Sequence, residues 1–159
     1  MPERALDAAD LRILRALQED AGQSNVELAR KVGLSASPCL RRVKALEQAG
    51  VIRGRHAIID PAAVGLPVSV FLQVTLERQT EPNLDRFDAA VAGWPEVVEC
   101  HLMTGDADYL LRVVAPDLDA FHRFLMQRLT RVEGVASIKS SFALKQTKYA
   151  GALPIEDLE

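Results

Sequence analysis

The sequence predicts an α+β chain with a helical, basic N-terminal part and a C-terminal part in which strands and helices alternate. Apolar residues recur at helical spacing within the first 60 residues, whereas strict alternation of apolar and polar residues begins near residue 68. The charge is divided in the same way. Residues 1–60 carry ten Lys/Arg and eight Asp/Glu, a net charge of +2, and residues 61–159 carry nine and fourteen, a net charge of −5.

The overall composition is that of a globular protein. The 159 residues are 48% hydrophobic and 26% charged, enough for one ordinary domain or two small ones. No stretch approaches the roughly 18 apolar residues of a membrane span, and the N-terminus has no apolar signal core. We therefore expect a cytoplasmic protein with no membrane partner. Cys39 and Cys100 are far apart and form no CxxC pair, so we expect no metal site and no cofactor.

Two helices with clear start signals are predicted before residue 34. Asp7 precedes the periodic leucines of the first helix and can cap it, and Gly22 is a plausible stop. The second helix starts in a capping box, in which Ser24 is followed three residues later by Glu27. Gly33 ends this helix after about two turns.

A third helix is predicted to begin around residues 35–38, with Leu40, Val43 and Leu46 on its apolar face and its cations pointing away. Residues 50–59 then predict a small β-hairpin with Gly54 near the bend, which is the expected place for a wing. We place an N-terminal domain at residues 1–60, a linker at 61–66 and a second domain at 67–159.

Two short helices with a glycine-containing turn between them, the second of them basic, predict a winged helix-turn-helix that binds double-stranded DNA. Residues 28–55 contain seven basic residues and one acid. The phosphate groups of DNA interact with this local positive charge, so it matters more than the net charge of the chain. A solvated basic face, or an ordinary three-helix bundle, is the alternative. The predicted DNA-binding residues are Ser35, Ser37, Pro38, Arg41, Arg42, Lys44, Arg53 and Arg55.

The remainder predicts the element order β-α-β-β-α-β, a ferredoxin-like domain. Strands are expected at 68–77, 97–103, 109–114 and 137–148, with one helix between the first pair and another before the last strand. The two helices cover one face of the sheet. The other face, on which we place Phe71 and Phe142, needs cover as well, and a second subunit is the simplest one. We therefore predict at least a homodimer.

Two motifs resemble the Lrp/AsnC (leucine-responsive, feast/famine) family of bacterial transcription regulators. The stretch LSASPCLRRV at 34–43, followed by Leu46-Glu47, is similar to that family's recognition helix. The stretch ECHLMTGDADYLL at 99–111 is similar to its second signature. The tail after residue 140 resembles a subset of members, and the resemblance covers almost the whole chain.

The resemblance implies a DNA-binding regulator whose oligomeric state or DNA affinity responds to a small effector, an amino acid. It also implies dimers that assemble further, often to octamers, with the effector bound beside the hairpin at 104–109. Backbone N–H groups near Gly105 could hold a carboxylate, and an aspartate could pair with an ammonium group. The same residues could equally be only a good hairpin turn. The candidate effector-binding residues are Met103, Thr104, Gly105, Asp106, Asp108 and Tyr109.

Other functions fit the sequence less well. An enzyme is not expected, because no nucleophile elbow, P-loop or dinucleotide motif occurs and neighbouring strand residues such as Cys100 and His101 point to opposite faces. A metal-sensing repressor would need clustered soft ligands. An effector-independent DNA-organising protein remains an alternative, whereas a pure assembly module would not need the basic segment.

Overall fold

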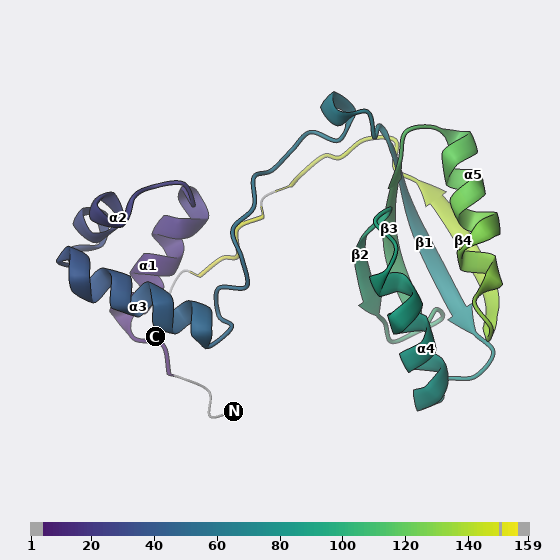
Figure 1. Cartoon of the computed structure of the whole chain (residues 1–159), viewed down its shortest axis with the longest axis horizontal. Coiled ribbons are helices and arrows are strands. Elements are labelled where there is room, and N and C mark those ends of the chain that lie inside the picture. The colour runs from purple at the N-terminus through teal and green to yellow at the C-terminus, as the bar shows by residue number, and fades with distance from the viewer. Residues whose placement is uncertain (1–4, 150, 156–159) are drawn as a thin grey trace. The chain divides into compact units, whose positions relative to one another are not determined.

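A computed structural model of the chain describes residues 5–149 and 151–155, which fall into two compact units (Figure 1). The first comprises Met1–Ile58 together with Lys148–Glu159, and the second comprises Ile59–Thr147. The polypeptide therefore passes from one unit to the other twice. The predicted second domain extended to residue 159, whereas the structure groups the chain from residue 148 with the N-terminal unit.

The first unit is built on three helices, α1 (Ala8–Glu19), α2 (Asn25–Val32) and α3 (Ala36–Gln48). Each has one apolar face, and the three faces meet in a single core. The small side chain of Ala29 is 2% exposed in this core, which allows α2 and α3 to approach closely. The core residues are Ile13, Ala16, Leu17, Leu28, Ala29, Val32, Cys39, Val43 and Leu46.

The predicted helix caps of α1 and α2 are confirmed. Asp7 Oδ1 accepts from the backbone N–H of Asp10 (2.8 Å), and Ser24 Oγ accepts from that of Glu27 (3.3 Å) while the Glu27 carboxylate accepts from the Ser24 N–H (2.8 Å). These bonds satisfy N–H groups that a helix start leaves unpaired. Gly33 follows α2 with φ +72°, a conformation that glycine adopts at little cost.

The apolar face predicted for α3 is wrong in one position. Cys39, Val43 and Leu46 are buried, whereas Leu40 is 43% exposed. The buried set follows the spacing i, i+4, i+7 of a 3.6-residue helix, and the predicted set followed i, i+3, i+6, which drifts off the stripe. Leu40 therefore lies on the outer surface of α3.

The hairpin predicted at residues 50–59 does not form in the single chain. After α3 the backbone N–H groups of Val51 and Ile52 both donate to the carbonyl of Leu46, and Ile52 packs against the helical core. Beyond it, residues 53–60 run without a strand partner in the part of the chain that the structure describes. Ile58 and Ile59 are exposed there.

The second unit has the predicted β-α-β-β-α-β order and thus the ferredoxin-like fold. Its strands are β1 (Val68–Leu76), β2 (Val97–Leu102), β3 (Tyr109–Ala115) and β4 (Val135–Phe142), and its helices are α4 (Glu81–Ala92) and α5 (Leu118–Gln127). Two short 3₁₀ turns, Ala62–Val64 and Leu129–Arg131, precede β1 and follow α5. The sheet is antiparallel with the order β2-β3-β1-β4, and both helices lie on one of its faces (Figure 1).

Alternation along β1 divides the sheet into a covered and an open face. Val70, Leu72 and Val74 are fully buried beneath the helices, whereas Phe71 is 38% exposed on the open face. Phe142 does not share that open face, contrary to the prediction. It pairs with Val70 across the strands, so its side chain lies on the helix side, where its ring meets Phe121 edge-on at 5.4 Å.

The last strand also differs from the prediction. It begins at Val135 and ends at Phe142, whereas the predicted strand ran from 137 to 148. Backbone pairing with β1 stops there because β1 itself begins at Val68, and no neighbour remains for residues 144–148 among the described strands. Among the residues that the structure describes, no helix has the length and apolar composition to cross a membrane.

Candidate functional sites

The outer surface of α3 presents a cationic strip of side chains. Ser37, Arg41 and Lys44 are exposed, and together with the exposed Leu40 they border a shallow hollow along the helix. Neither Arg41 nor Lys44 has an ion pair or side-chain hydrogen bond within the described residues. Cations that remain free in the folded domain are available for an external anion.

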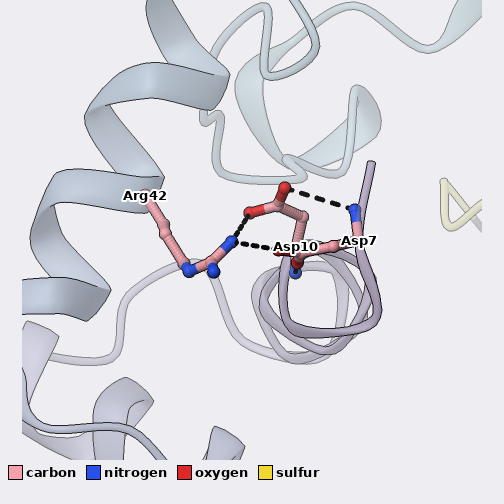
Figure 2. A network of polar contacts seen from close by, with 3 residues as sticks. All are labelled: Asp7, Asp10 and Arg42. Carbon is pink, nitrogen blue, oxygen red and sulfur yellow. Dashed lines mark hydrogen bonds and ion pairs between the residues drawn. The ribbon is translucent and has the colours of Figure 1, made fainter. Parts of the chain in front are cut away.

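Arg42 has a different placement from its neighbour Arg41. Its Nη1 donates to Asp7 Oδ2 (2.7 Å) and to Asp10 Oδ1 (2.9 Å), as Figure 2 shows. Asp10 is 1% exposed, so this ion pair compensates a buried carboxylate. Arg42 is among the residues predicted to bind DNA. Its guanidinium instead points back to the start of α1 and holds α3 there through the ion pair.

The same contacts shift the pKa values of the network. The pKa of Asp7 lies below its usual value of 3.8, first because its carboxylate accepts the Asp10 N–H bond and then because Arg42 donates to it. The pKa of Arg42 is raised by its bonds to Asp7 and Asp10. Both shifts favour the charged forms that hold the two helices together.

The other predicted DNA-binding residues lie before, at the start of and after α3. Ser35 precedes α3 and is exposed, without a side-chain cap bond, while Pro38 is half-buried in the first turn. Arg55 Nη2 pairs with Glu47 at the end of α3 (2.9 Å), and Arg53 is exposed in the segment that follows. Leu40 was not in the predicted set, and a stricter 3.6-residue count would have found it.

The second predicted site is the turn between β2 and β3. The backbone N–H of Met103 donates to the carbonyl of Asp108 (2.8 Å) and closes the turn. Met103, Thr104, Gly105 and Asp106 are all exposed. The backbone N–H groups of 104–106 have no partner within the described residues, and Gly105 has φ +120°, where a side chain would be strained.

The side chain of Asp108, at the end of this turn, is buried in the domain. It is 6% exposed, and its Oδ2 accepts from the backbone N–H of Leu76 at the end of β1 (2.6 Å). Its Oδ1 accepts from the side-chain amide of Gln79. Both carboxylate oxygens are thus engaged within the chain, which is the structural alternative that the sequence left open.

Tyr109 is also directed inward. Its ring is 1% exposed and lies 4.3 Å from that of Phe87, and its hydroxyl donates to Asp88 on α4 (2.7 Å). Burial, and then the hydrogen bond to Asp88, raise its pKa well above its ordinary value. The structure thus divides the predicted effector residues into four exposed residues and two that brace the turn.

Cys100 and His101 do lie on opposite faces of β2, as expected, and His101 only approaches Glu99 at 3.9 Å. Burial, and then the charge of Asp88, raise the pKa of the Cys100 thiol to about 11. Its thiolate is therefore scarce at neutral pH. Within the described part of the chain, no group of three or more His, Cys, Asp or Glu residues is placed to hold a metal ion.

Both units match known protein families. Residues 6–53 match a winged helix-turn-helix DNA-binding domain, and residues 69–153 match the Lrp/AsnC ligand-binding domain. The chain belongs to the Lrp/AsnC family of transcription regulators. The predicted family, its two-part fold and its non-enzymatic character are thereby confirmed.

Relatives of similar length support this assignment. The chain is 49% identical over 150 residues to a Bkd operon transcriptional regulator of Pseudomonas aeruginosa, covering 94% of this chain and 98% of that protein. It is 45% identical over 145 residues to a leucine-responsive regulatory protein of Rhizobium meliloti, covering 91% and 93%. A transcriptional regulator of Neisseria meningitidis, solved in complex with L-Met, superposes with a TM-score of 0.87 at 41% identity, covering 96% and 98%.

The ion pair network predicts a defined acid response. Because the folded-state pKa of Asp7 is below 3.8, its contribution to stability is complete above the unfolded-state pKa and is lost as the pH falls through the lower folded-state value. Asp7→Asn keeps a capping oxygen but removes the charge. We expect the stability of α1–α3, measured by amide hydrogen exchange between neutral pH and pH below 3.8, to fall less on acidification in this variant than in wild type.

Glu19→Gln is the matched control, because it removes an exposed carboxylate of the same helix, which pairs with Lys31. Its acid response should follow that of wild type. Indistinguishable curves for Asp7→Asn and wild type would refute the role assigned to Asp7.

Proposed function

We propose that the exposed strip on α3 reads operator DNA and that the turn at 103–106 binds an amino-acid effector. The observation that carries the proposal is the presence of free polar groups at both places in a chain that is an Lrp/AsnC regulator. Arg41 and Lys44 have no partner on α3 or elsewhere in the described chain, and neither do the backbone N–H groups of 104–106. Both sets of groups therefore remain available to a partner.

The chemistry of the α3 strip suits the major groove. An arginine donates two hydrogen bonds to the O6 and N7 atoms of guanine, while a lysine can hold phosphate. Ser37 allows close approach near the start of the helix, and the exposed Leu40 supplies an apolar contact of the kind that thymine methyl groups accept. Ser35, Pro38, Arg53 and Arg55 flank the strip and are proposed as phosphate or backbone contacts.

The turn offers a site for the two charged ends of an amino acid. The N–H groups around Gly105 suit a carboxylate, and the exposed Asp106 suits an α-ammonium group. Met103, with its flexible thioether side chain, is placed to touch the effector side chain. We assign Asp108 and Tyr109 the positioning of this turn, because their polar atoms are engaged inside the domain. The relative solved with L-Met supports an amino acid as the effector class.

We also propose that the open sheet face is covered by a second copy of the chain. Phe71 lies at the centre of this face, beside the Arg112–Glu99 ion pair (2.8 Å). An apolar ring in such a position favours burial against a symmetric partner. Dimers formed there are proposed to associate further, up to octamers.

Single substitutions at neighbouring arginines separate DNA contact from folding. Arg41→Ala is expected to weaken operator binding by about 1–3 kcal/mol and to relax the preference for guanine, as for a lost bidentate base contact, and to leave stability unchanged. Arg42→Ala leaves buried Asp10 without this cation and is expected to lower the thermal stability of the helical unit. Fluorescence anisotropy with operator DNA and calorimetry measure the two effects. Unchanged DNA affinity in Arg41→Ala would remove α3 from the proposed contact.

Effector binding should raise the melting temperature, because a ligand that binds only the folded state stabilises it. At ten times its Kd the ligand adds about 1.4 kcal/mol, which corresponds to roughly 5–10 °C for a domain of this size. A screen of the twenty amino acids, including L-Met, is expected to give at least one such shift, and Asp106→Asn should abolish it without lowering the melting temperature of the free protein.

Asp108→Asn is the comparison variant, because Asp108 is assigned to positioning the turn and not to contacting the effector. It weakens the bonds to Leu76 and Gln79, so it should lower the melting temperature before any ligand is added. A full shift retained in Asp106→Asn would exclude Asp106 from the site. The absence of any shift in wild type would favour an effector-independent DNA-organising protein.

The dimer proposal predicts that Phe71→Asp dissociates the protein. A charge on the open face would be buried in the interface, so light scattering should show a mass close to that of the 17.4 kDa monomer. Leu144→Asp, at a side chain that is 98% exposed and outside the sheet, should keep the wild-type mass. A wild-type mass for Phe71→Asp would contradict this interface.

A further inference from the structure

The segment 151–155 near the C-terminus lies against α1 of the helical unit. Gln18 and Arg15, on the same side of α1, both reach the backbone of this segment. The contacts join residues more than 130 positions apart in the sequence, and none of them was expected from it.

These hydrogen bonds are made to the backbone of the segment and not to its side chains. The side-chain amide of Gln18 accepts from the N–H of Leu153 (2.6 Å) and donates to the carbonyl of the same residue (3.1 Å). A neighbouring β-strand would pair with the two groups in the same way. The Arg15 guanidinium makes a further contact, because its Nε and Nη2 both donate to the carbonyl of Ile155 (3.3 and 2.9 Å).

An apolar groove accompanies these polar contacts. It is bordered on one side by Leu14 and Leu17 of α1 and on another by Val51 and Ile52 after α3. Leu153 and Ile155 contribute to its lining, and the backbone between them makes a tight turn at Pro154, because the N–H of Ile155 donates to the carbonyl of Leu153 (2.9 Å). The groove therefore combines hydrogen bonds to the backbone of a tight turn with apolar contacts from the two residues at its ends.

We propose that this groove is a peptide-binding surface of the DNA-binding unit and that its resident ligand is the chain's own segment 151–155. Hydrogen bonds from Gln18 and Arg15 to its main chain hold the segment, and the side chains of Leu153 and Ile155 add apolar contacts. Docking holds segment 151–155 on the DNA-binding unit, with which it is grouped. A free tail would leave the DNA-binding unit attached only through the segment that follows residue 58.

Hydrogen exchange of the full chain tests the docking. Gln18→Ala removes both bonds to Leu153, so exchange of the Leu153 amide is expected to accelerate about tenfold, at roughly 1 kcal/mol for a neutral hydrogen bond and somewhat more for the pair. Gln18→Glu keeps the acceptor but loses the donor, and should give a smaller acceleration. Exchange within α1–α3 reports whether each variant is folded.

Glu19→Ala is the matched control on α1, since Glu19 pairs with Lys31 and not with the tail. Its Leu153 amide should exchange at the wild-type rate. Equal rates at Leu153 in wild type, Gln18→Ala and Glu19→Ala would overturn the docking proposal.

A cross-link distinguishes the chain's own tail from that of a second copy. In a Cys100→Ser background, which removes the exposed native cysteine, Ala21→Cys and Leu153→Cys, both at residues that line the groove, are treated with a short bismaleimide, so that Gln18 and its backbone bonds are kept. A cross-linked band at the mass of one chain on a denaturing gel is expected. A band at twice that mass would overturn assignment to the chain's own tail, and the absence of a cross-link would overturn docking altogether. Each single-cysteine variant controls for reaction elsewhere.

Discussion

The position of α3 depends on how the charge of Asp10 is compensated. This carboxylate is 1% exposed at the start of α1, and a buried charge without a partner costs several kcal/mol. Arg42 supplies the partner from α3, and the same guanidinium reaches Asp7, whose carboxylate caps α1 (Figure 2). Apolar packing sets how closely α1 and α3 approach. The ion pair adds direction, because it is formed only when Arg42 faces the start of α1 and Arg41 consequently faces outward.

The ligand-binding domain uses a buried aspartate for the same purpose. Asp108 joins the β2–β3 turn to the end of β1 through Leu76, and to the following loop through Gln79. Asp10 and Asp108 are the two charged side chains that are buried among the described residues. Each is hydrogen-bonded inside the protein, whereas a neighbouring group, Arg41 in one case and Asp106 in the other, is exposed and has no side-chain partner among the described residues. In this Lrp/AsnC regulator the two buried aspartates thus separate the polar groups that brace the fold from those proposed to contact DNA and effector.

Several apolar groups remain uncovered in the single chain. Phe71 lies on the open sheet face, and Ile58 and Ile59 lie in an extended segment whose backbone finds no strand partner among the described residues. A chain that functions without a partner seldom exposes both an apolar sheet face and an unpaired strand-like segment. By contrast, the tail finds its partner within the chain, because the amide of Gln18 can replace the missing strand for one residue.

The sequence by itself determined the element order of the second unit, the starts of α1 and α2 and the two-part division of charge. These are local properties. A capping box needs only four neighbouring residues, and the alternation along β1 reveals a half-covered strand without knowledge of its neighbours. The motifs at 34–43 and 99–111 were sufficient to indicate the family. The tertiary structure decided which of the nominated polar residues were free, because Arg42 and Asp108 meet partners 32 positions away. It also decided the face of Phe142, the lack of a hairpin at 50–59 and the return of the tail to α1. Each of these depends on pairing between distant segments, and no local pattern specifies such pairing.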